Sequence, residues 1–283
     1  MQVLKSTAEM RAAAARLNEP GKSVGFVPTM GALHEGHLSL VRKCRKENDV
    51  CIVSIFVNPA QFNDKSDLKK YPRDLQKDLG LLEKEKVDFV FAPDEKEIYP
   101  NGLVADVKPP AVAETLEGKS RPGHFAGVCT VVKKFFEIIS PARAYFGRKD
   151  YQQFLVVKEM AWAHGLPVEI VLCPTVREKD GLALSSRNTR LDAMERKAAT
   201  VLFRALSAAK EKILAGEKSP AVVECFAKGF FEKAPLARPE YFAVRRAEDL
   251  SEFAEIRGGV VLLCACRIGK TRLIDNLVVS VPA

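Results

Sequence analysis

The sequence contains no apolar run long enough to cross a bilayer. A membrane-spanning helix needs about 20 consecutive, mostly apolar residues, and the 283-residue chain has no such run. The first 18 residues also lack the apolar core of a secretory signal. We therefore expect a cytoplasmic protein without a membrane partner.

Paired cysteine motifs are also missing. The chain has seven cysteines, an odd number, and no two of them form a Cys-x-x-Cys pair. Cys51, Cys129 and Cys173 lie in apolar runs, where a cysteine behaves as a small, reduced core residue. Cys264 and Cys266 alternate on a predicted strand, so both should face one side. We predict no disulfide and no zinc site.

Acidic residues are outnumbered, with 36 Asp and Glu against 44 Lys and Arg, which gives a net charge of +8. This balance suits either a nucleic acid backbone or small anionic substrates in a positive cleft. The basic run 42–46 falls on the polar side of a predicted helix, where solvated charge is ordinary. We therefore expect small-molecule partners and no nucleic acid, and a nucleic-acid-binding protein is the alternative from another class.

One stretch combines a strand, a glycine turn and the start of a helix. The apolar run 24–27 precedes Pro-Thr-Met-Gly-Ala-Leu-His-Glu-Gly-His at 28–37, and apolar residues recur at helical spacing over 38–47. Open α/β sheets usually bind ligands where strands end in such loops. Gly31 and Gly36 lack a Cβ, so the backbone can bend sharply and a ligand can come close.

His34 and His37 lie three residues apart, which predicts that both share one face of the first helical turn. The free N–H groups and the positive dipole end of that helix attract phosphate. Two imidazoles beside a phosphate can donate hydrogen bonds to oxygens that gain charge in a transition state. We interpret the stretch as a nucleotide triphosphate site. Surface helix residues, or half of a metal site without a recognisable third ligand, are the alternatives.

The order of apolar runs predicts an α/β protein. The run 50–57 is apolar almost throughout, which is typical of a strand buried on both faces of a parallel sheet. The other predicted strands of this part are 24–27, 87–92, 143–146 and 168–173. Predicted helices alternate with them at 6–17, 38–47, 72–86, 127–139 and 151–164. We predict a doubly wound, Rossmann-like parallel sheet over residues 1–175, which we expect to bind the nucleotide triphosphate.

The remainder predicts a smaller α+β domain over residues 176–283, which we expect to close over a nucleotide. Its predicted helices are 192–215 and 220–233, and its predicted strands are 241–245, 260–268 and 272–281. Gly269-Lys270 between the last two suggests a hairpin turn. In the first domain, the stretch 99–115 is rich in Pro, Gly and Ala and predicts an irregular connection, a candidate mobile lid.

The stretch 28–37 resembles the H-x-G-H signature of the nucleotidylyltransferase superfamily and, more closely, the pantoate–β-alanine ligase family. Further segments agree with that family in the same order along nearly the whole chain. They are FVNPAQF at 56–62, YPR at 71–73, RPGHF at 121–125, GRKDYQQ at 147–153, LSSRN at 184–188 and RLIDN at 272–276. One H-x-G-H alone is a weak signal, whereas six ordered segments are a specific one.

The resemblance implies a reaction, its substrates and an assembly. Such an enzyme condenses pantoate with β-alanine through a pantoyl adenylate, consumes ATP, needs Mg²⁺ and releases pyrophosphate and AMP. Positioning and charge stabilisation should dominate this chemistry. A homodimer is implied as well. The runner-up within the superfamily is another adenylyltransferase that uses ATP and a phosphorylated acceptor.

Roles for individual residues also follow from the resemblance. His37 matches the family's proton donor, and His34 and Lys149 would act with it on the phosphates. The nucleotide would contact Met30, Gly31, His34, Gly36, His37, Gly147, Arg148, Lys149, Asp150, Val176, Leu184, Ser185, Ser186 and Arg187. The substrates pantoate and β-alanine would contact Gln61, Gln153, Met30, Phe62 and Asn58. Asp78, on the helix predicted after Pro72, is the candidate magnesium ligand.

Plainer interpretations are open for several of these residues. Lys149 and Asp150 could form a surface ion pair, which is worth about 0–1 kcal/mol. The serines at 185–186 could simply cap a helix. Gln61 and Gln153 could be solvated loop residues, the commoner situation of glutamine.

Two positions depart from the commonest pattern of the family. Ala126 stands where arginine is usual, and Arg148 stands where glutamate is frequent. If the usual arginine binds substrate or a partner subunit, Arg148 or Arg121 would have to compensate.

Overall fold

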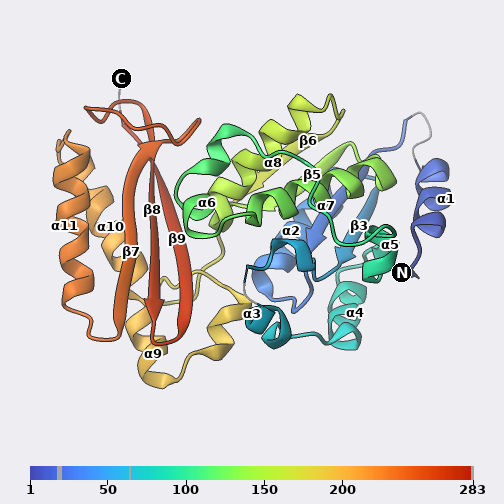
Figure 1. The fold of residues 1–283 in the computed structure, drawn as a ribbon, viewed down its shortest axis with the longest axis horizontal. Coiled ribbons are helices and arrows are strands. Elements are labelled where there is room, and N and C mark those ends of the chain that lie inside the picture. Colours follow the sequence, from blue (N-terminus) through green and yellow to red (C-terminus); the bar gives the residue numbers. More distant parts are fainter. Residues whose placement is uncertain (18–20, 64, 282–283) are drawn as a thin grey trace. The chain divides into compact units, whose positions relative to one another are not determined.

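The computed structural model describes residues 1–17, 21–63 and 65–281. The chain divides into two compact units, which are labelled by their elements in Figure 1. Unit 1 comprises Met1–Gly147 and Gln152–Pro174, and unit 2 comprises Arg148–Tyr151 and Thr175–Ala283. In the part of the chain that is described, no helix is long and apolar enough to cross a membrane.

Unit 1 is built on a six-stranded sheet in which all neighbouring strands are parallel. The strands are β1 (Gln2–Leu4), β2 (Val24–Thr29), β3 (Val50–Ile55), β4 (Phe89–Phe91), β5 (Arg143–Gly147) and β6 (Glu169–Cys173). Their order is β1-β4-β3-β2-β5-β6. The chain moves outward from β2 through β3 to β4 and returns on the other side of β2 as β5. The carboxyl end of the sheet at such a reversal is the usual ligand site of open α/β folds.

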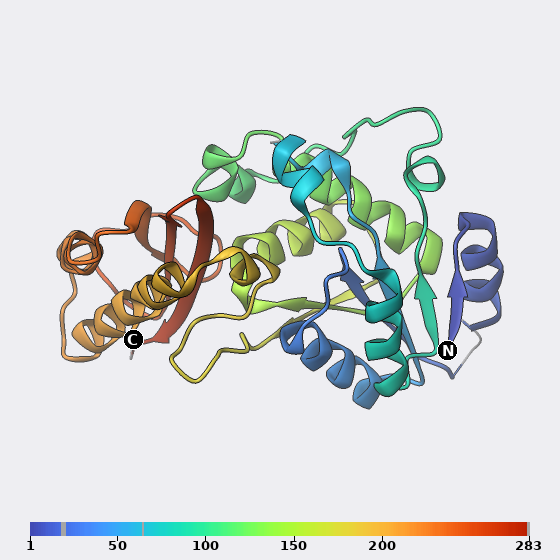
Figure 2. The same ribbon diagram turned by 90° about the horizontal axis from the view of Figure 1, so that it is seen from below.

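Helices cover both faces of this sheet. They are α1 (Thr7–Leu17), α2 (Glu35–Glu47), α3 (Lys65–Lys70), α4 (Leu75–Lys84), α5 (Glu95–Ile98), α6 (Glu117–Ser120), α7 (His124–Ile139) and α8 (Tyr151–Ala163), with the 3-10 turns η1 (Pro59–Gln61) and η2 (Ala111–Glu114). One core cluster joins Val41 of α2 and Leu82 of α4 to Val27 of β2. The neighbouring Phe26 faces the other side and packs edge-on against Phe135 of α7, with ring centroids 5.8 Å apart. Figure 2 shows α2 and α4 on the side of the sheet away from α7. The predicted α/β class is confirmed.

Capping side chains set where the helices begin. Ser6 and Glu9 form a capping box ahead of α1, because the Ser6 Oγ accepts from the Glu9 N–H at 3.2 Å and the Glu9 carboxylate accepts from the Ser6 N–H at 3.0 Å. The helix predicted over 72–86 is wrong at its start. Asp74 takes the N-cap position, so α4 begins at Leu75. Pro20, a residue type that cannot continue a helix, lies outside the described residues.

Unit 2 contains a three-stranded antiparallel sheet in the order β7-β8-β9. Its elements are η3 (Arg148–Asp150), η4 (Ser186–Arg190), α9 (Ala193–Ala199), α10 (Val201–Leu214), α11 (Pro220–Glu232), β7 (Ala237–Arg246), β8 (Gly259–Ile268) and β9 (Thr271–Ser280). Cys264 and Cys266 share one core cluster with the apolar residues of α10 and α11, so they face one side as predicted. Ile268 pairs with Thr271 around a two-residue turn at Gly269, whose φ is 53°. The predicted hairpin and the α+β class of this part are confirmed.

The continuous helix predicted over 192–215 is wrong, because two helices meet there. The break falls at Thr200, whose hydroxyl donates to the Lys197 carbonyl at 2.9 Å. A threonine that hydrogen-bonds back to its own helix competes with the main-chain ladder and disturbs it. Apolar spacing alone continues through this position and gives no sign of the break.

Candidate active site

The loop after β2 turns through two residues in the left-handed region. Gly31 has a φ of 76° and Ala32 a φ of 51°, a region that glycine enters without strain and alanine does not. Asp78 of α4 holds this turn, since its Oδ2 accepts from the Ala32 N–H at 2.9 Å and its Oδ1 from the Leu33 N–H at 2.8 Å. Asp78 is only 2% exposed. Burial raises its pKa above the ordinary value of 3.8, although the two N–H groups act to lower it.

His34 and His37 close the start of α2 with their own rings. The His34 Nδ1 accepts from the Gly36 N–H at 3.1 Å, and the His37 Nδ1 accepts from the His34 N–H at 3.3 Å. This is a capping box in which two imidazoles take the places usually held by serine and glutamate. The two ring centroids lie 4.1 Å apart. His34 is therefore the residue before the helix, and His37 is in its first turn.

These hydrogen bonds fix where the ring protons are. A ring nitrogen that accepts from a backbone N–H carries no proton, so the neutral form of each ring has its proton on Nε2. Each histidine then has an Nε2–H donor at the amino end of α2, where the helix dipole attracts anions. Donors held in this way suit phosphate oxygens that gain negative charge during a reaction.

Three of the residues predicted to contact pantoate are linked to one another. The Gln61 Nε2 lies 3.2 Å from the Met30 Sδ, and the Gln61 Oε1 accepts from the Asn58 Nδ2 at 3.1 Å. The Tyr99 hydroxyl donates to the Asn58 Oδ1 at 2.7 Å. Asn58 and Gln61 are 1% and 8% exposed, so both are buried and neither is a solvated loop residue. Fixed amides of this kind can give directed hydrogen bonds to a small polar ligand.

The main chain of Gln61 is held by two side chains for which the sequence indicated no such contact. The Gln61 carbonyl accepts from the His124 Nδ1 at 2.8 Å and from the Arg121 Nη2 at 3.2 Å. Because a carbonyl only accepts, the His124 proton is on Nδ1, and its Nε2 accepts from the Arg121 Nη1 at 3.0 Å. Tyr99 was likewise missed as a partner of Asn58. The sequence shows the segment 121–125 as part of the family pattern. It does not show the contact of that segment with Gln61, which lies 60 residues before Arg121.

The other predicted residues of unit 1 have separate surroundings. Phe62 packs edge-on against Tyr71, with ring centroids 5.8 Å apart. Gly147 ends β5, the neighbour of β2 at the reversal of strand order. Gln153 is half-buried in the first turn of α8. The adjacent Gln152 is 3% exposed and donates to two carbonyls of the η2 region at 2.8 Å, so it holds that segment in place.

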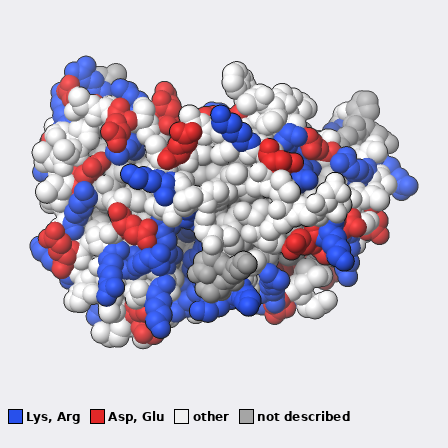
Figure 3. Space-filling model, viewed as in Figure 1, with Lys and Arg blue, Asp and Glu red and all other residues white. Residues whose placement is uncertain are grey.

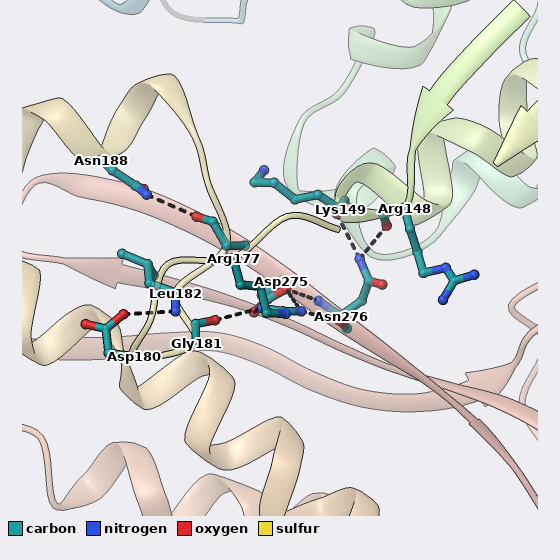
Figure 4. A network of polar contacts seen from close by, with 10 residues as sticks. Arg148, Lys149, Arg177, Asp180, Gly181, Leu182, Asn188, Asp275 and Asn276 are labelled. Atoms are coloured by element: carbon teal, nitrogen blue, oxygen red, sulfur yellow. Dashed lines mark hydrogen bonds and ion pairs between the residues drawn. The ribbon is translucent and has the colours of Figure 1, made fainter. Parts of the chain in front are cut away.

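In unit 2, the predicted nucleotide residues Arg148, Lys149 and Asp150 form η3. The Lys149 Nζ lies 3.6 Å from the Asp150 Oδ1, and 19% and 46% of these side chains are exposed. Asn276 of β9 donates from Nδ2 to the carbonyls of Arg148 at 2.9 Å and Lys149 at 2.8 Å (Figure 4). The main chain of η3 is therefore fixed by β9, while the Lys149 and Arg148 side chains extend in different directions.

We call residues 176–184 the strap. The Leu184 N–H donates to the Val176 carbonyl at 3.0 Å, which brings two predicted nucleotide residues together at the ends of the strap. Inside it, the Arg177 Nη1 and Nη2 donate to the Asp275 carboxylate of β9 at 2.6 and 2.9 Å. A two-pronged arginine–carboxylate pair is the strongest and most directional form of this contact.

Ser185 follows the strap and caps η4, because its Oγ accepts from the Arg187 N–H at 3.3 Å. The capping interpretation therefore holds for Ser185, and the hydroxyl keeps its own proton for donation elsewhere. Ser186 and Arg187 lie within η4 and are half-buried. On the face drawn in Figure 3, basic side chains gather over unit 2, with acidic side chains among them. The basic residues of η4 and α9 are Arg187, Arg190, Arg196 and Lys197.

Four buried side-chain atoms have no hydrogen-bond partner within the described ranges. They are the Arg148 Nε, Thr175 Oγ1, Asn188 Oδ1 and Asn276 Oδ1. All four belong to unit 2. Arg148 is in η3, and Thr175 directly precedes the strap. The side chain of Asn188 donates to a carbonyl of the strap, and that of Asn276 donates to a carbonyl of η3. An unsatisfied buried polar atom costs about 1–3 kcal/mol and is rare in a folded protein. Donors and acceptors of a bound molecule or of water would satisfy them.

The described residues contain no group of three or more His, Cys, Asp or Glu side chains that could hold a metal ion. Both Nδ1 atoms of His34 and His37 are used by backbone N–H groups. Both oxygens of Asp78 are used in the same way. These side-chain atoms therefore fit a role in holding the main chain of the loop better than a role as a full set of protein ligands for a metal ion.

A parallel sheet with a histidine-capped helix at its reversal of strand order defines an α/β protein that binds an anionic ligand such as a nucleotide at the carboxyl end of its sheet. The model of the pantoate-beta-alanine ligase family matches residues 2–278, so the chain belongs to that family of ligases.

Named relatives agree with this assignment. The chain is 53% identical over 280 residues to the pantothenate synthetase of Roseiflexus sp. strain RS-1, which covers 99% of this chain and 100% of the relative. It is similar to the crystal structure of pantothenate synthetase from Thermus thermophilus, with a TM-score of 0.92, 45% identity and coverage of 98% and 99% of the two chains. It is also similar to the pantoate-beta-alanine ligase of Francisella tularensis, complexed with beta-gamma ATP and beta-alanine. That likeness has a TM-score of 0.79 and 37% identity, and covers 98% and 97% of the chains.

Proposed function

We propose that the protein joins pantoate to β-alanine in two ATP-dependent steps. In the first step the pantoate carboxylate attacks the α-phosphorus of ATP, which forms pantoyl adenylate and releases pyrophosphate. In the second step the amine of β-alanine attacks the acyl carbon and displaces AMP. Family membership gives the substrates. The single structural observation that carries the proposal is the imidazole capping box at the amino end of α2.

The capping box supplies charge stabilisation in the first step. As the α-phosphorus is attacked, negative charge grows on the phosphate oxygens and on the departing pyrophosphate. The Nε2–H groups of His34 and His37 are fixed before the reaction, because each Nδ1 is tied to a backbone N–H. Such preorganised donors favour the transition state over the ground state. His37 is in addition the proposed proton donor, as in the family.

The buried amides of unit 1 are the proposed pantoate ligands. Gln61 and Asn58 hold each other in fixed orientations, and Met30 contacts the Gln61 amide. A small hydroxy acid needs several directed hydrogen bonds and an apolar wall, which Met30 and Phe62 could form. Gln153 is the second proposed glutamine ligand for the substrates.

The proposed nucleotide ligands of unit 2 are in η3, the ends of the strap and η4. Lys149 offers a positive charge on a flexible stem, and Asp150 lies close enough to orient it. Arg187 and the hydroxyls of Ser185 and Ser186 would add donors for phosphate oxygens. The buried atoms without partners in this region support a role in ligand binding.

Magnesium is part of the proposal because the pyrophosphate leaving group is highly charged. Mg²⁺ is usually held by phosphates and water with one or two carboxylates, and so needs no protein cage. Asp78 as a magnesium ligand stays a prediction, since both of its oxygens already accept from the loop. We assign no step of the reaction to the metal.

By likeness to the family, we further propose a cytoplasmic homodimer. Sedimentation velocity over a tenfold range of protein concentration would measure the assembly. A single species at the mass of one chain throughout that range would contradict the dimer.

Product release tests the proposed reaction. Purified protein with ATP and Mg²⁺ is given pantoate alone, β-alanine alone, both, or neither, and AMP and pyrophosphate are measured. We expect sustained AMP release only with both substrates. Pyrophosphate released without AMP, in the presence of a phosphorylated acceptor, would instead identify another adenylyltransferase. Products that do not depend on pantoate would contradict the proposed substrate.

A further inference from the structure

Two consecutive residues of β9 anchor two separate segments of unit 2. Asp275 and Asn276 belong to the RLIDN segment, to which neither the sequence nor the proposed reaction gives a task. They are 4% and 3% exposed. Because successive side chains of a strand point to opposite faces, these two neighbours can reach different parts of the unit.

Asn276 fixes η3 through its amide. Both hydrogens of Nδ2 are used, one on the carbonyl of Arg148 at 2.9 Å and one on that of Lys149 at 2.8 Å. No other side chain type of this size offers two donors from one nitrogen at that position, since aspartate has only oxygens. The contact therefore sets the path of the main chain that carries the Lys149 side chain, without touching that side chain.

Asp275 fixes the strap through Arg177. The guanidinium donates both hydrogen bonds of a bidentate pair to the Asp275 carboxylate. It also donates to the carbonyls of Gly181 at 3.0 Å and Asn276 at 3.1 Å. It lies over the Phe203 ring, 4.5 Å from the centroid. One arginine thus ties the turn of the strap, a carboxylate and the main chain of β9 together, as Figure 4 shows.

We infer that Asp275 and Asn276 are positioning residues for ATP, which align the main chain of η3 with the strap from one rigid strand. The inference rests on the proposed function for the assignment of these segments to the nucleotide. Asp275 and Asn276 need not touch the nucleotide, because they act through Arg148, Lys149 and Arg177. β9 suits this task because it pairs with β8 over its whole length, from Thr271 to Ser280.

The test compares variants of the full-length protein for direct ATP binding and for kinetics. Asn276→Ala removes both donors, and Asn276→Asp keeps the shape but turns an oxygen toward the two carbonyls. Arg177→Lys keeps the charge but loses the fork that joins Asp275 to the strap. Val279→Ala is the matched control, because Val279 is a buried core residue of the same strand, 2% exposed, whose truncation destabilises β9 without removing a polar anchor.

We expect the Kd for ATP, measured calorimetrically without other substrates, to rise about 10- to 100-fold in Asn276→Ala, Asn276→Asp and Arg177→Lys. The KM for ATP should rise in parallel, while the KM for pantoate changes less than threefold. Val279→Ala should lower the melting temperature and leave the Kd for ATP within twofold of the wild type. Hydrogen exchange should increase around 148–151 in the Asn276 variants only.

Several results would overturn the inference. One is a folded Asn276→Ala and a folded Arg177→Lys that both bind ATP as the wild type does. Another is a Val279→Ala variant that weakens ATP binding as much as they do, because the effect would then be general destabilisation. A wild type that binds ATP but makes no pantothenate contradicts the proposed function alone. A wild type that does not bind ATP contradicts both.

Discussion

His37 caps α2 with one ring nitrogen, and we propose a separate, catalytic task for the other. Its Nδ1 accepts from the His34 N–H and so helps to cap α2. Its Nε2 is the proposed donor to phosphate. Asparagine places an oxygen where the Nδ1 lies, at the same distance along the side chain, but has nothing at the Nε2 position. Histidine alone combines both, which is a physical reason for this residue type at this place.

The pair His37→Asn and His37→Ala tests that division. We expect both variants to lose about 10²- to 10³-fold in kcat, as when one donor to a developing oxyanion is removed. Only His37→Ala should also lose about 1 kcal/mol of unfolding free energy, through the lost cap. Steady-state kinetics and denaturant titration measure the two effects. Near-normal turnover in His37→Asn would remove the Nε2 from the mechanism.

The contribution of Asp78 to the unfolding free energy should depend on pH. Burial raises its pKa above 3.8 in the folded state, so the folded protein holds this proton more tightly than the unfolded chain. That contribution to stability is fully present below pH 3.8 and is lost as the pH rises through the folded-state pKa. The unfolding free energy of the wild type minus that of Asp78→Asn should therefore fall as the pH rises from about 4 through the folded-state pKa of Asp78. Denaturant titrations across this range measure it, and a difference that stays flat or rises contradicts the burial argument.

At the scale of elements, the contact between α7 and η1 decides where Gln61 sits. A Cβ on Gly127 would lie 2.4 Å from the Ala60 carbonyl oxygen and 2.7 Å from the Gln61 nitrogen, both of them backbone atoms. The Gly127 carbonyl also accepts from the Asn58 Nδ2 at 3.0 Å. Only glycine allows this approach, so the proposed pantoate ligands depend on a position that lies outside their own loop.

Gly127→Ala should therefore raise the KM for pantoate, because η1 and Gln61 must move. We expect a rise of about tenfold and a loss of about 1–3 kcal/mol in stability from overpacking. Gly80→Ala in α4 is the matched control, since nothing lies within 4 Å of its added Cβ. Gly80→Ala should gain about 0.5–1 kcal/mol of unfolding free energy, because glycine loses more backbone entropy than alanine in the interior of a helix. A Gly127→Ala variant with unchanged KM would show that η1 is not positioned by α7.

A helix or strand is predictable from the sequence where one hydrophobic pattern runs through it. Its limits are not predictable where a single polar side chain sets them. The apolar run 50–57 indicated a strand buried on both faces, and β3 is such a strand. The sequence gives no sign of β1, because its three residues are too few to show a hydrophobic period. β1 is held by pairing with β4, which lies far along the chain. The start of α4 and the break at Thr200 were missed because each depends on one polar side chain.

At the scale of the whole molecule, ordered motifs predicted the family and the α/β class, but not how the motifs are held. Each predicted ligand is local in sequence, whereas its support comes from far along the chain. Asp78 holds a loop 45 residues earlier, and Asn276 holds Lys149 from 127 residues away. No periodicity or spacing encodes such pairs. Tyr99, His124, Asp275 and Asn276 therefore became meaningful only through the contacts that they make.

In the proposed reaction, pantoate is activated as an adenylate before β-alanine takes part. Exchange of labelled pyrophosphate into ATP measures that step directly, with pantoate and Mg²⁺ present and β-alanine absent. We predict exchange that depends on pantoate and falls about 10²-fold or more in His37→Asn. Absence of exchange until β-alanine is added, in a protein that still makes pantothenate, would contradict the adenylate intermediate.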